Sequence, residues 1–318
     1  MGEPLMASAD PLIFSVQHFC LHDGPGIRSL VFFKGCPLRC LWCQNIESWK
    51  TEPEIAFKDH LCINCRRCVE KCPEHALSEV GKRNTEQCRF CFTCTDNCPS
   101  GALTRFGVSK SVDDLMEELR PEFSLLRTSG GGVTFTGGEP TLHPEFIGKL
   151  AKTLRSEGID VALETCGLFS LEKLRPVLQE FQLVLFDIKI FDEEQHRKLC
   201  GVGNKEIKNN LKSLADDWNK RMGSFIWPRL PIIPEMTDGN DNIKRWAAFL
   251  RELKISFLTI VPYHPMGVNK RRWFGLPPTP DLRIPRDEDL KKVEKLLEDE
   301  GISAYKPGTE NFRKHNIR

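Results

Sequence analysis

Residues 34–45 read KGCPLRCLWCQN, and the rest of the chain is interpreted outward from this stretch. Cys36, Cys40 and Cys43 are separated by three and then two residues, so one loop presents three thiols. Clusters that only carry electrons are normally held by four thiolates. Three cysteines therefore predict a four-iron cluster with one iron open to an exogenous ligand. A zinc knuckle completed by a distant Cys or His is the alternative.

The residues before this loop extend the pattern. A glycine-rich turn at 22–26 leads into the apolar run Ser29–Phe33, which leads into the cysteine loop. The whole string from His22 to Asn45 resembles the radical S-adenosylmethionine (SAM) enzymes, and within them the subgroup that activates glycyl radical enzymes. The resemblance implies that SAM binds the open iron. It also implies that one electron breaks the S–C5′ bond and gives a 5′-deoxyadenosyl radical.

The overall composition argues against several other classes of protein. The 318 residues carry 45 Lys and Arg against 44 Asp and Glu, so no nucleic-acid partner is expected at a net charge of +1. No apolar stretch reaches about 18 residues, and no basic amino terminus precedes an apolar run. We therefore expect neither a membrane span nor an export signal. Of the fourteen cysteines, eleven stand in metal-binding spacings, which favours a reducing, anaerobic cytoplasm over a disulfide-bonded scaffold.

Residues 52–106 contain two copies of the bacterial ferredoxin spacing, each ending in Cys-Pro. In that spacing the fourth cysteine of each copy binds the other cluster, whereas zinc is the weaker alternative. We expect one 4Fe-4S cluster on Cys62, Cys65, Cys68 and Cys98, and a second on Cys72, Cys88, Cys91 and Cys94. The predicted domains are 1–51, the inserted ferredoxin-like domain 52–106, and 107–318.

After the insertion, apolar runs typical of strands alternate with helical patterns, which predicts a parallel α/β sheet. Four polar motifs follow such runs, as the cysteine loop does: Gly137-Gly138-Glu139-Pro140, Glu164-Thr165-Cys166-Gly167, Asp187-Ile188-Lys189 and His264. In barrels of parallel strands, chemistry collects at the carboxyl ends of the strands. The predicted fold is an open, partial (β/α)6 barrel of the TIM type with a small α+β ferredoxin-like insertion.

The resemblance also implies roles for individual residues. It assigns SAM contacts to Trp42, Cys43, Gln44, Gly138, Glu139, Asp187, Ile188, Lys189 and His264. Glu164 and Asp187 match positions that hold a monovalent cation, although many relatives have Asp at the first. Arg229 is a further candidate because its segment resembles a strand end of the family. Cys166 and Cys200 have no neighbouring ligand in the sequence, so both are predicted to be structural thiols.

Three local patterns predict the connecting structure. Ser111 is expected to cap a helix that begins at Val112. Pro144 is expected to open a helix that Gly158 closes. Residues 270–286 are rich in Pro and Arg without apolar periodicity, which predicts a surface loop.

The predicted function is activation of a glycyl radical enzyme, with flavodoxin or ferredoxin as the electron donor and a monomeric chain. The three-cysteine cluster would form the radical, and the partner would lose one glycine Cα hydrogen. Two alternatives stay open at this point. One is a radical SAM enzyme that acts on a small molecule, and the other is a ferredoxin-type electron carrier, which would leave the three-cysteine loop without a purpose.

Overall fold

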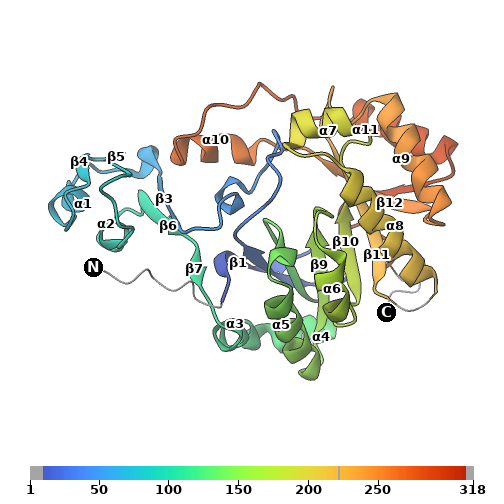
Figure 1. Ribbon diagram of the computed structural model, residues 1–318, viewed down its shortest axis with the longest axis horizontal. Helices are drawn as coiled ribbons and strands as arrows, with labels where there is room; N and C mark the ends of the chain where they lie inside the picture. The colour runs from blue at the N-terminus through green and yellow to red at the C-terminus, as the bar shows by residue number, and fades with distance from the viewer. Residues whose placement is uncertain (1–9, 221–222, 313–318) are drawn as a thin grey trace.

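One nine-stranded sheet forms the body of the protein in the computed structural model, which describes residues 10–220 and 223–312 (Figure 1). Neighbouring strands are parallel from β13 to β2, whereas β1 and β7 are antiparallel additions at one edge. In spatial order the strands are β13 (Ser303–Tyr305), β12 (Phe257–Pro262), β11 (Phe225–Ile232), β10 (Leu183–Asp187), β9 (Asp160–Thr165), β8 (Gly132–Gly137), β2 (Arg28–Phe33), β1 (Leu12–Cys20) and β7 (Val108–Ser109). The predicted open α/β sheet is confirmed, and β13, β1 and β7 extend it beyond the six expected strands.

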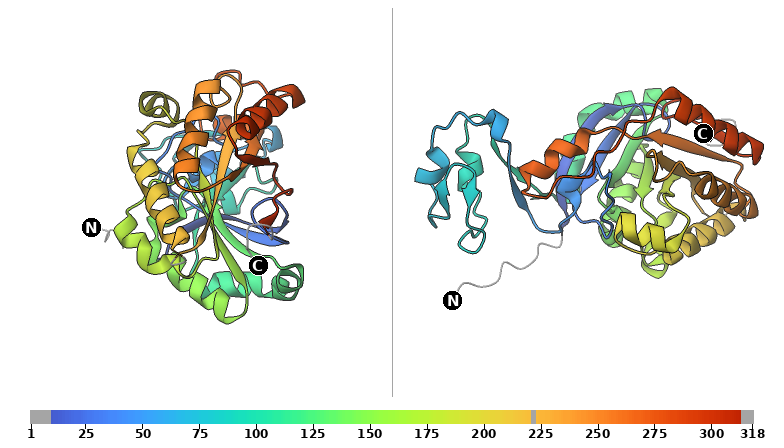
Figure 2. Two further views of the ribbon diagram at one scale, coloured as in Figure 1. Left: turned by 90° about the vertical axis from the view of Figure 1, so that its right-hand side faces the viewer. Right: turned by 90° about the horizontal axis from the view of Figure 1, so that it is seen from above.

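Helices that follow the strands pack against the sheet (Figure 2). Their bounds are α3 (Val112–Leu119), η3 (Arg120–Glu122), α4 (Phe123–Ser129), η4 (Pro140–Leu142), α5 (Pro144–Ser156), α6 (Leu171–Leu178), α7 (Glu193–Cys200), α8 (Lys205–Asn219), α9 (Asn240–Glu252) and α11 (Asp287–Asp299). On α5, Ile147, Leu150 and Leu154 repeat at helical spacing and are fully buried, so this stripe belongs to the core.

The expected capping signals act as predicted. The side chain of Ser111 accepts a hydrogen bond from the backbone N–H of Asp114, and the carboxylate of Asp114 accepts one from the Ser111 backbone N–H at 2.8 Å. This reciprocal pair satisfies donors that the first turn of α3 would leave unpaired. Pro144 is the first residue of α5, which ends at Ser156, two residues before Gly158.

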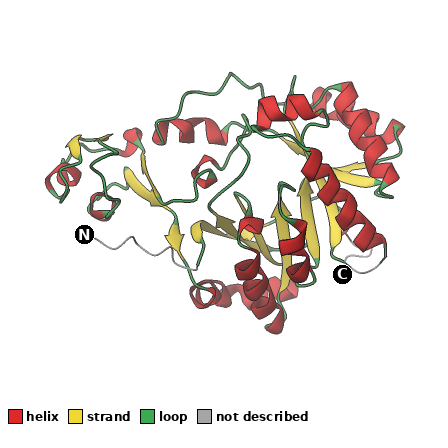
Figure 3. Ribbon diagram, viewed as in Figure 1, coloured by secondary structure: helices red, strands yellow, loops and turns green. Residues whose placement is uncertain are grey.

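The segment 54–106, from β3 to β6, forms a separate module at one end of the molecule (Figure 1). It contains two small antiparallel sheets and short helices, and most of it is loop (Figure 3). Its elements are β3 (Glu54–Phe57) paired with β6 (Leu103–Phe106), β4 (Leu77–Glu79) paired with β5 (Lys82–Arg83), η2 (Asp59–Leu61), α1 (Arg67–Glu70) and α2 (Thr93–Asp96), and η1 (Ile46–Ser48) lies between the cysteine loop and the module. Three of the eight buried residues in the hydrophobic cluster of this module are cysteines, Cys68, Cys72 and Cys94, as in folds that depend on metal binding.

Helix α10 (Met266–Trp273) joins this module to the main sheet. Lys58 lies over the ring of Trp273, with 5.4 Å from its Nζ to the ring centroid, and Arg272 pairs with Asp59 at 2.5 Å. The prediction of irregular structure from residue 270 is therefore wrong for residues 270–273. The helix shows no apolar stripe because it packs through Gly267 and a buried Arg271, and its basic last turn suits the negative end of the helix dipole.

Within the described part of the chain, no helix is long and apolar enough to span a bilayer. The first nine residues, on which the expectation about an export signal partly depends, lie outside that part.

Candidate active site

The cysteine loop is anchored at three points of its backbone. Gly35 donates its N–H to the carbonyl of Ser48 at 2.7 Å, Arg39 donates to Cys200 at 2.8 Å, and Leu41 donates to Leu199 at 3.0 Å. Gly35 itself has a φ of 92°, a conformation that side-chain-bearing residues rarely adopt. The loop is thus bound to η1 on one side and to the end of α7 on the other, which fixes the direction of its thiols.

The three thiols open into a cavity of about 190 Å³ at the carboxyl ends of the parallel strands. Of the residues predicted for the site, those that line it are Cys36, Cys40, Cys43, Trp42, Gln44, Gly138, Glu164, Asp187, Lys189 and Arg229. Lining residues to which the sequence analysis gave no individual role are Leu38, Asn45, Thr136, Gly137, Thr165, Pro231 and Val261, and Cys166, which was assigned a structural role, lines the cavity as well. Each of the strands β8 to β12 contributes at or next to its carboxyl end, as expected for this class of sheet.

Glu139, Ile188 and His264 are not among the lining residues. Ile188 is fully buried, and His264 is half-buried with a buried Nδ1 that no group in residues 10–220 and 223–312 satisfies. Burial, with a smaller contribution from Lys270, lowers the pKa of His264. The predicted SAM contacts of these residues remain predictions.

The carboxylate of Glu139 is buried and accepts hydrogen bonds from other groups of the protein. It accepts hydrogen bonds from the hydroxyl of Thr141 at 2.6 Å, from the hydroxyl of Thr165 at 2.9 Å and from the backbone N–H of Cys166 at 2.7 Å. Burial raises its pKa, and these donors oppose the rise. Glu139 therefore ties the loop after β8 to the end of β9, next to the cysteine loop.

Gly138 allows a close approach of two loops. A Cβ at this position would lie 2.1 Å from the carbonyl oxygen of Gly35, and the backbone N–H of Gly138 donates to Phe33 at 2.8 Å. The next residue, Glu139, donates its N–H to Gly35 at 2.8 Å. The glycine is therefore required by packing against the start of the cysteine loop.

Arg229 lies among three carboxylates, and two of them, Glu164 and Asp187, line the cavity together with it. Arg229 lies 3.2 Å from Asp23, 3.4 Å from Glu164 and 3.9 Å from Asp187. Burial lowers the pKa of Arg229, but the three carboxylates together outweigh burial and raise it. Burial raises the pKa of Glu164 to about 7, against the opposing effect of Arg229. The positive group between the two predicted cation ligands is therefore Arg229.

Asp23 belongs to the turn before β2, at the opposite end of that strand from the cysteine loop, and reaches Arg229 from there. Its backbone carbonyl accepts a hydrogen bond from the hydroxyl of Thr134 at 2.8 Å. The only sequence signal for Asp23 as a site residue is its place inside the His22–Asn45 string.

Asp187 and Lys189 form an ion pair inside the cavity rather than on the surface. Lys189 Nζ lies 2.9 Å from Asp187 Oδ2, and the lysine side chain is buried. Burial lowers the pKa of Lys189, but Asp187 and the thiols of Cys40 and Cys166 outweigh it, so the net change is a rise. A positive charge is thereby held beside the cysteine loop.

Cys166 and Cys200 lie against the cysteine loop, although they are far from it in the sequence. The Cys166 thiol contacts Cys36, and this hydrogen bond lowers the pKa of Cys36 against the effect of burial. The Cys200 thiol contacts Cys40, and both are buried. Cys166 lines the cavity, whereas Cys200 does not. Their contact follows from the meeting of β9 and α7 with the loop, which no local signal reveals.

The donor set of the cysteine loop consists of thiols, the ligands that iron–sulfur clusters use. In the described residues, no three His, Cys, Asp or Glu side chains are close enough to hold one metal ion. Burial raises the pKa of Cys43 to about 11, so its thiolate needs a bound cation for stability. The three thiols beside an open cavity leave space for the fourth, exogenous ligand.

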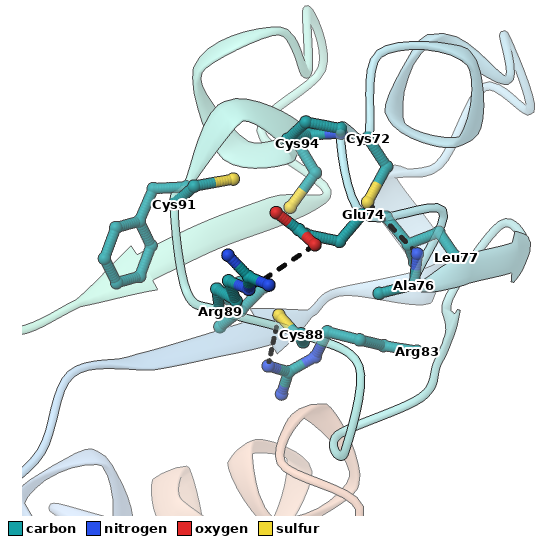
Figure 4. A pocket seen from close by; sticks show the side chains of 12 residues that line it. Cys72, Glu74, Ala76, Leu77, Arg83, Cys88, Arg89, Cys91 and Cys94 are labelled. Atoms are coloured by element: carbon teal, nitrogen blue, oxygen red, sulfur yellow. Dashed lines mark hydrogen bonds and ion pairs between the residues drawn. The ribbon is translucent and has the colours of Figure 1, made fainter. Parts of the chain in front are cut away.

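The module groups its eight thiols into two sets of four. One pocket is lined by Cys72, Cys88, Cys91 and Cys94 (Figure 4), and a second by Cys62, Cys65, Cys68 and Cys98. Each set combines cysteines from both sequence copies, as the crossed spacing predicts. Backbone N–H groups point at three of the sulfurs: Asn64 to Cys62 at 3.4 Å, Ala76 to Cys72 at 3.3 Å and Leu103 to Cys98 at 3.4 Å.

Comparisons with known proteins agree with this geometry. Residues 79–254 match a model of the radical SAM superfamily, and residues 57–78 match a 4Fe-4S binding domain. The chain is 35% identical to the choline trimethylamine-lyase activating enzyme of Oleidesulfovibrio alaskensis, over 92% of this chain and 96% of the relative. It is 36% identical to the trans-4-hydroxy-L-proline dehydratase activating enzyme of Clostridioides difficile, over 91% and 96%.

Another relative and a solved structure extend the comparison. The (2S)-3-sulfopropanediol dehydratase activating enzyme of Klebsiella oxytoca is 38% identical, over 90% of this chain and 93% of the relative. The crystal structure of Streptococcus suis SuiB bound to precursor peptide SuiA matches with a TM-score of 0.53 at 14% identity, over 89% of this chain and 49% of that one, and shows a shared fold alone. The chain therefore belongs to the radical SAM superfamily, in its subgroup of glycyl radical enzyme activating enzymes.

Proposed function

We propose that this activating enzyme carries three 4Fe-4S clusters with distinct roles. Cys36, Cys40 and Cys43 hold the cluster that binds SAM, because their thiols face a cavity with room for a further ligand. The two sets of four thiols in the module hold the other clusters, because each set lines its own pocket. The domain boundaries at 52 and 106 are part of this proposal, and the pairing of β3 with β6 supports them.

The charge of the cavity wall supports SAM as its occupant. Of the lining residues, Lys189 and Arg229 contribute two positive charges, and Glu164 and Asp187 contribute up to two negative charges. The lining thus offers an opposite charge both to the carboxylate of SAM and to its amino and sulfonium groups. Lys189 is placed to bind that carboxylate, since it is a buried lysine held by a single acid at the cavity.

A 4Fe-4S cluster held by Cys36, Cys40 and Cys43 would supply the single electron that reductive cleavage of SAM requires, and the products would be methionine and a 5′-deoxyadenosyl radical able to take a Cα hydrogen from a partner's glycine. The chain itself positions the reactants and keeps water away from them. Trp42, Gln44 and Gly138 are proposed to contact SAM from the loop side, and Asp187 and Lys189 from the sheet. Backbone contacts at Glu139 and Ile188, and a contact of His264 on the adenosine side, complete the proposed site.

The protein substrate is a glycyl radical enzyme, and reduced flavodoxin or ferredoxin is the proposed electron donor to a monomeric chain. The named relatives activate lyases and dehydratases at 35 to 38% identity, so the proposal extends to the class of partner and not to one substrate. A monovalent cation at Glu164 and Asp187 stays a prediction, since Arg229 already contributes a positive charge there.

Metal analysis combined with spectroscopy tests the proposal. Anaerobically reconstituted protein should contain about twelve irons per chain, and the Cys36→Ala variant about eight. Adding SAM to the reduced protein should change the electron paramagnetic resonance (EPR) spectrum of one cluster only, and a glycine-centred doublet should appear once a partner is present. Zinc bound at the three-cysteine loop, or full iron content in Cys36→Ala, would contradict the assignment.

A further inference from the structure

Arg83 directs its guanidinium group at a thiol of the module (Figure 4). It is the last residue of β5, and its backbone pairs with Leu77 of β4. The Nη1 of Arg83 donates a hydrogen bond to the sulfur of Cys88 at 3.6 Å. A guanidinium does not lose its proton in a protein, so this donor stays positively charged at every physiological pH. A fixed positive charge therefore contacts one member of the Cys88 set, which consists of Cys72, Cys88, Cys91 and Cys94.

An aromatic ring holds this guanidinium in place. The guanidinium carbon of Arg83 lies 4.8 Å from the ring centroid of Phe90, within the range of a cation–π contact. Phe90 in turn lies beside the buried ring of Phe92, with 6.3 Å between the two centroids. Arg83 is itself half-buried, so solvent and salt screen its charge less than that of an exposed side chain. The guanidinium is thus held both by the thiol and by the aromatic residues of the module.

Within residues 10–220 and 223–312, Arg83 forms no ion pair that would neutralise its charge. Two acidic residues of the module are bound to other cations: Glu79 contacts Lys82 at 2.8 Å, and Glu74 contacts Arg89 at 3.5 Å (Figure 4). Arg89 lines the same pocket as Arg83, but its side chain is 80% exposed. Because Arg89 and Glu74 offset each other, the net positive charge at this pocket is that of Arg83.

Neutral donors, in contrast, serve both sets of four thiols. Backbone N–H groups point at sulfurs of the Cys88 set and of the Cys62 set, which consists of Cys62, Cys65, Cys68 and Cys98. One hydroxyl also lies near each set, that of Thr93 at 3.4 Å from the Cys91 sulfur and that of Ser100 at 3.8 Å from the Cys98 sulfur. Arg66 lines the pocket of the Cys62 set, but it is exposed and donates to no thiol in the described part of the chain. The two sets therefore differ by one charged donor in contact with a thiol.

We propose that Arg83 raises the reduction potential of the cluster at the Cys88 set above that of the cluster at the Cys62 set. This inference rests on the proposed function, in which each set holds a 4Fe-4S cluster. Reduction moves one electron from reduced flavodoxin or ferredoxin to a cluster and adds one negative charge there, and no covalent bond forms or breaks. A positively charged donor on a ligand sulfur stabilises the reduced state, and hydrogen bonds to the sulfurs are among the factors that set such potentials. The electron therefore settles first on the cluster at the Cys88 set.

The test compares Arg83→Met with Arg89→Met in the reconstituted holoenzyme. Both substitutions remove a guanidinium that lines the same pocket, but only Arg83 donates to a thiol, so Arg89→Met is the matched control. In an EPR-monitored redox titration, the signal that responds to SAM belongs to the cysteine loop, and the remaining signals belong to the module. We expect the higher module midpoint to fall by about 59 mV in Arg83→Met, equal to a tenfold change in the equilibrium of a one-electron reduction, and to stay unchanged in Arg89→Met.

A second measurement needs no substitution and covers the case in which Arg83→Met fails to fold or to hold its clusters. Wild-type protein is labelled with ¹⁵N in its arginine guanidinium groups only and is poised at a potential that reduces one module cluster. Pulsed EPR spectroscopy should show a ¹⁵N coupling to that cluster, because an N–H···S bond carries spin density to the donor. An unchanged midpoint in Arg83→Met that retains its full iron, an equal fall in Arg89→Met, or no ¹⁵N coupling to the cluster reduced first would overturn the inference. Absence of clusters from the module of the wild type would instead contradict the proposed function.

Discussion

The cysteine loop and the inserted module use the same ligand chemistry in opposite surroundings. The loop presents three thiols to a cavity of about 190 Å³ that four charged side chains also line: Glu164, Asp187, Lys189 and Arg229. The module gathers its thiols in fours around two pockets of about 10 Å³, and one thiol of each set, Cys91 and Cys65, is exposed. A complete set of four thiols suits electron transfer, whereas an incomplete set beside an open, charged cavity suits chemistry on a bound molecule.

The two regions also differ in what holds them in place. The loop is bonded to η1, to the end of α7 and to the glycine turn that directly follows β8 of the nine-stranded sheet. The module has small sheets and a cysteine-rich core, and contacts with α10 are among those that join it to the body. Cluster loss should therefore unfold the module while it leaves the sheet intact.

The largest expected effect follows from removal of one thiol of the cysteine loop, which should stop radical formation and leave the module clusters in place. Cys40→Ala should abolish glycyl radical formation, because two thiols cannot hold the cluster that binds SAM, while the spectra of the module clusters persist. EPR spectroscopy with a partner enzyme and iron analysis measure both results. Cys20→Ala is the control, because Cys20 lies on β1 outside the cavity lining. Retention of the glycyl radical signal in Cys40→Ala would contradict the account.

Removal of one ligand from each module cluster tests whether the module passes electrons to the cysteine loop. In the double variant Cys62→Ala and Cys88→Ala, each module cluster loses one ligand. Radical formation should fall by about tenfold or more with flavodoxin as donor, since removal of a relay slows electron delivery, and should be unchanged with a strong chemical reductant. Initial rates of 5′-deoxyadenosine formation with the two reductants provide the comparison. Equal losses with both would show that the module only supports the structure.

The charged side chains of the cavity are expected to control the affinity for SAM. Lys189→Met should weaken SAM binding by about tenfold, or about 1.4 kcal/mol, because the buried ammonium would no longer meet the SAM carboxylate. Equilibrium binding to the reconstituted protein measures the change. Arg120→Met removes a surface ion pair with Glu157 and should bind SAM as the wild type does. Wild-type affinity in Lys189→Met would remove that residue from the proposed site.

The smallest effect concerns pH. The pKa of Glu164 is raised to about 7 in the folded protein, above its unfolded value of 4.5, so its contribution to stability is present at low pH and is lost as pH rises through about 7. Between pH 6 and 8 the wild type should lose about 1 kcal/mol of unfolding free energy relative to Glu164→Gln. Anaerobic urea unfolding of both proteins measures the difference. A parallel pH dependence of the two would show that Glu164 titrates normally.

The sequence predicts those parts of the molecule that depend on neighbouring residues. Three patterns are local: the spacing of Cys36, Cys40 and Cys43, the two ferredoxin copies, and the polar motifs after apolar strands. In the structure the cysteines line three separate pockets, and the polar motifs lie at strand ends. The cap at Ser111 is local in the same sense.

Other features depend on contacts between distant segments and have no local signal. Residues 270–273 are helical because α10 packs on the cysteine loop through Gly267, not because of an apolar stripe. Cys166 and Cys200 reach the loop only when β9 and α7 are assembled, and Asp23 reaches Arg229 from the opposite end of β2. The side chain of Glu139 turns from the cavity because three nearby donors bind it.

The most direct test of the account is whether the open iron of the three-cysteine cluster binds SAM. Electron–nuclear double resonance of the reduced protein, with ¹⁵N in the SAM amino group, reports that bond. The account predicts a nitrogen coupling to one cluster, which Cys43→Ala abolishes and the module variants retain. No coupling in protein that contains its full iron would contradict the account.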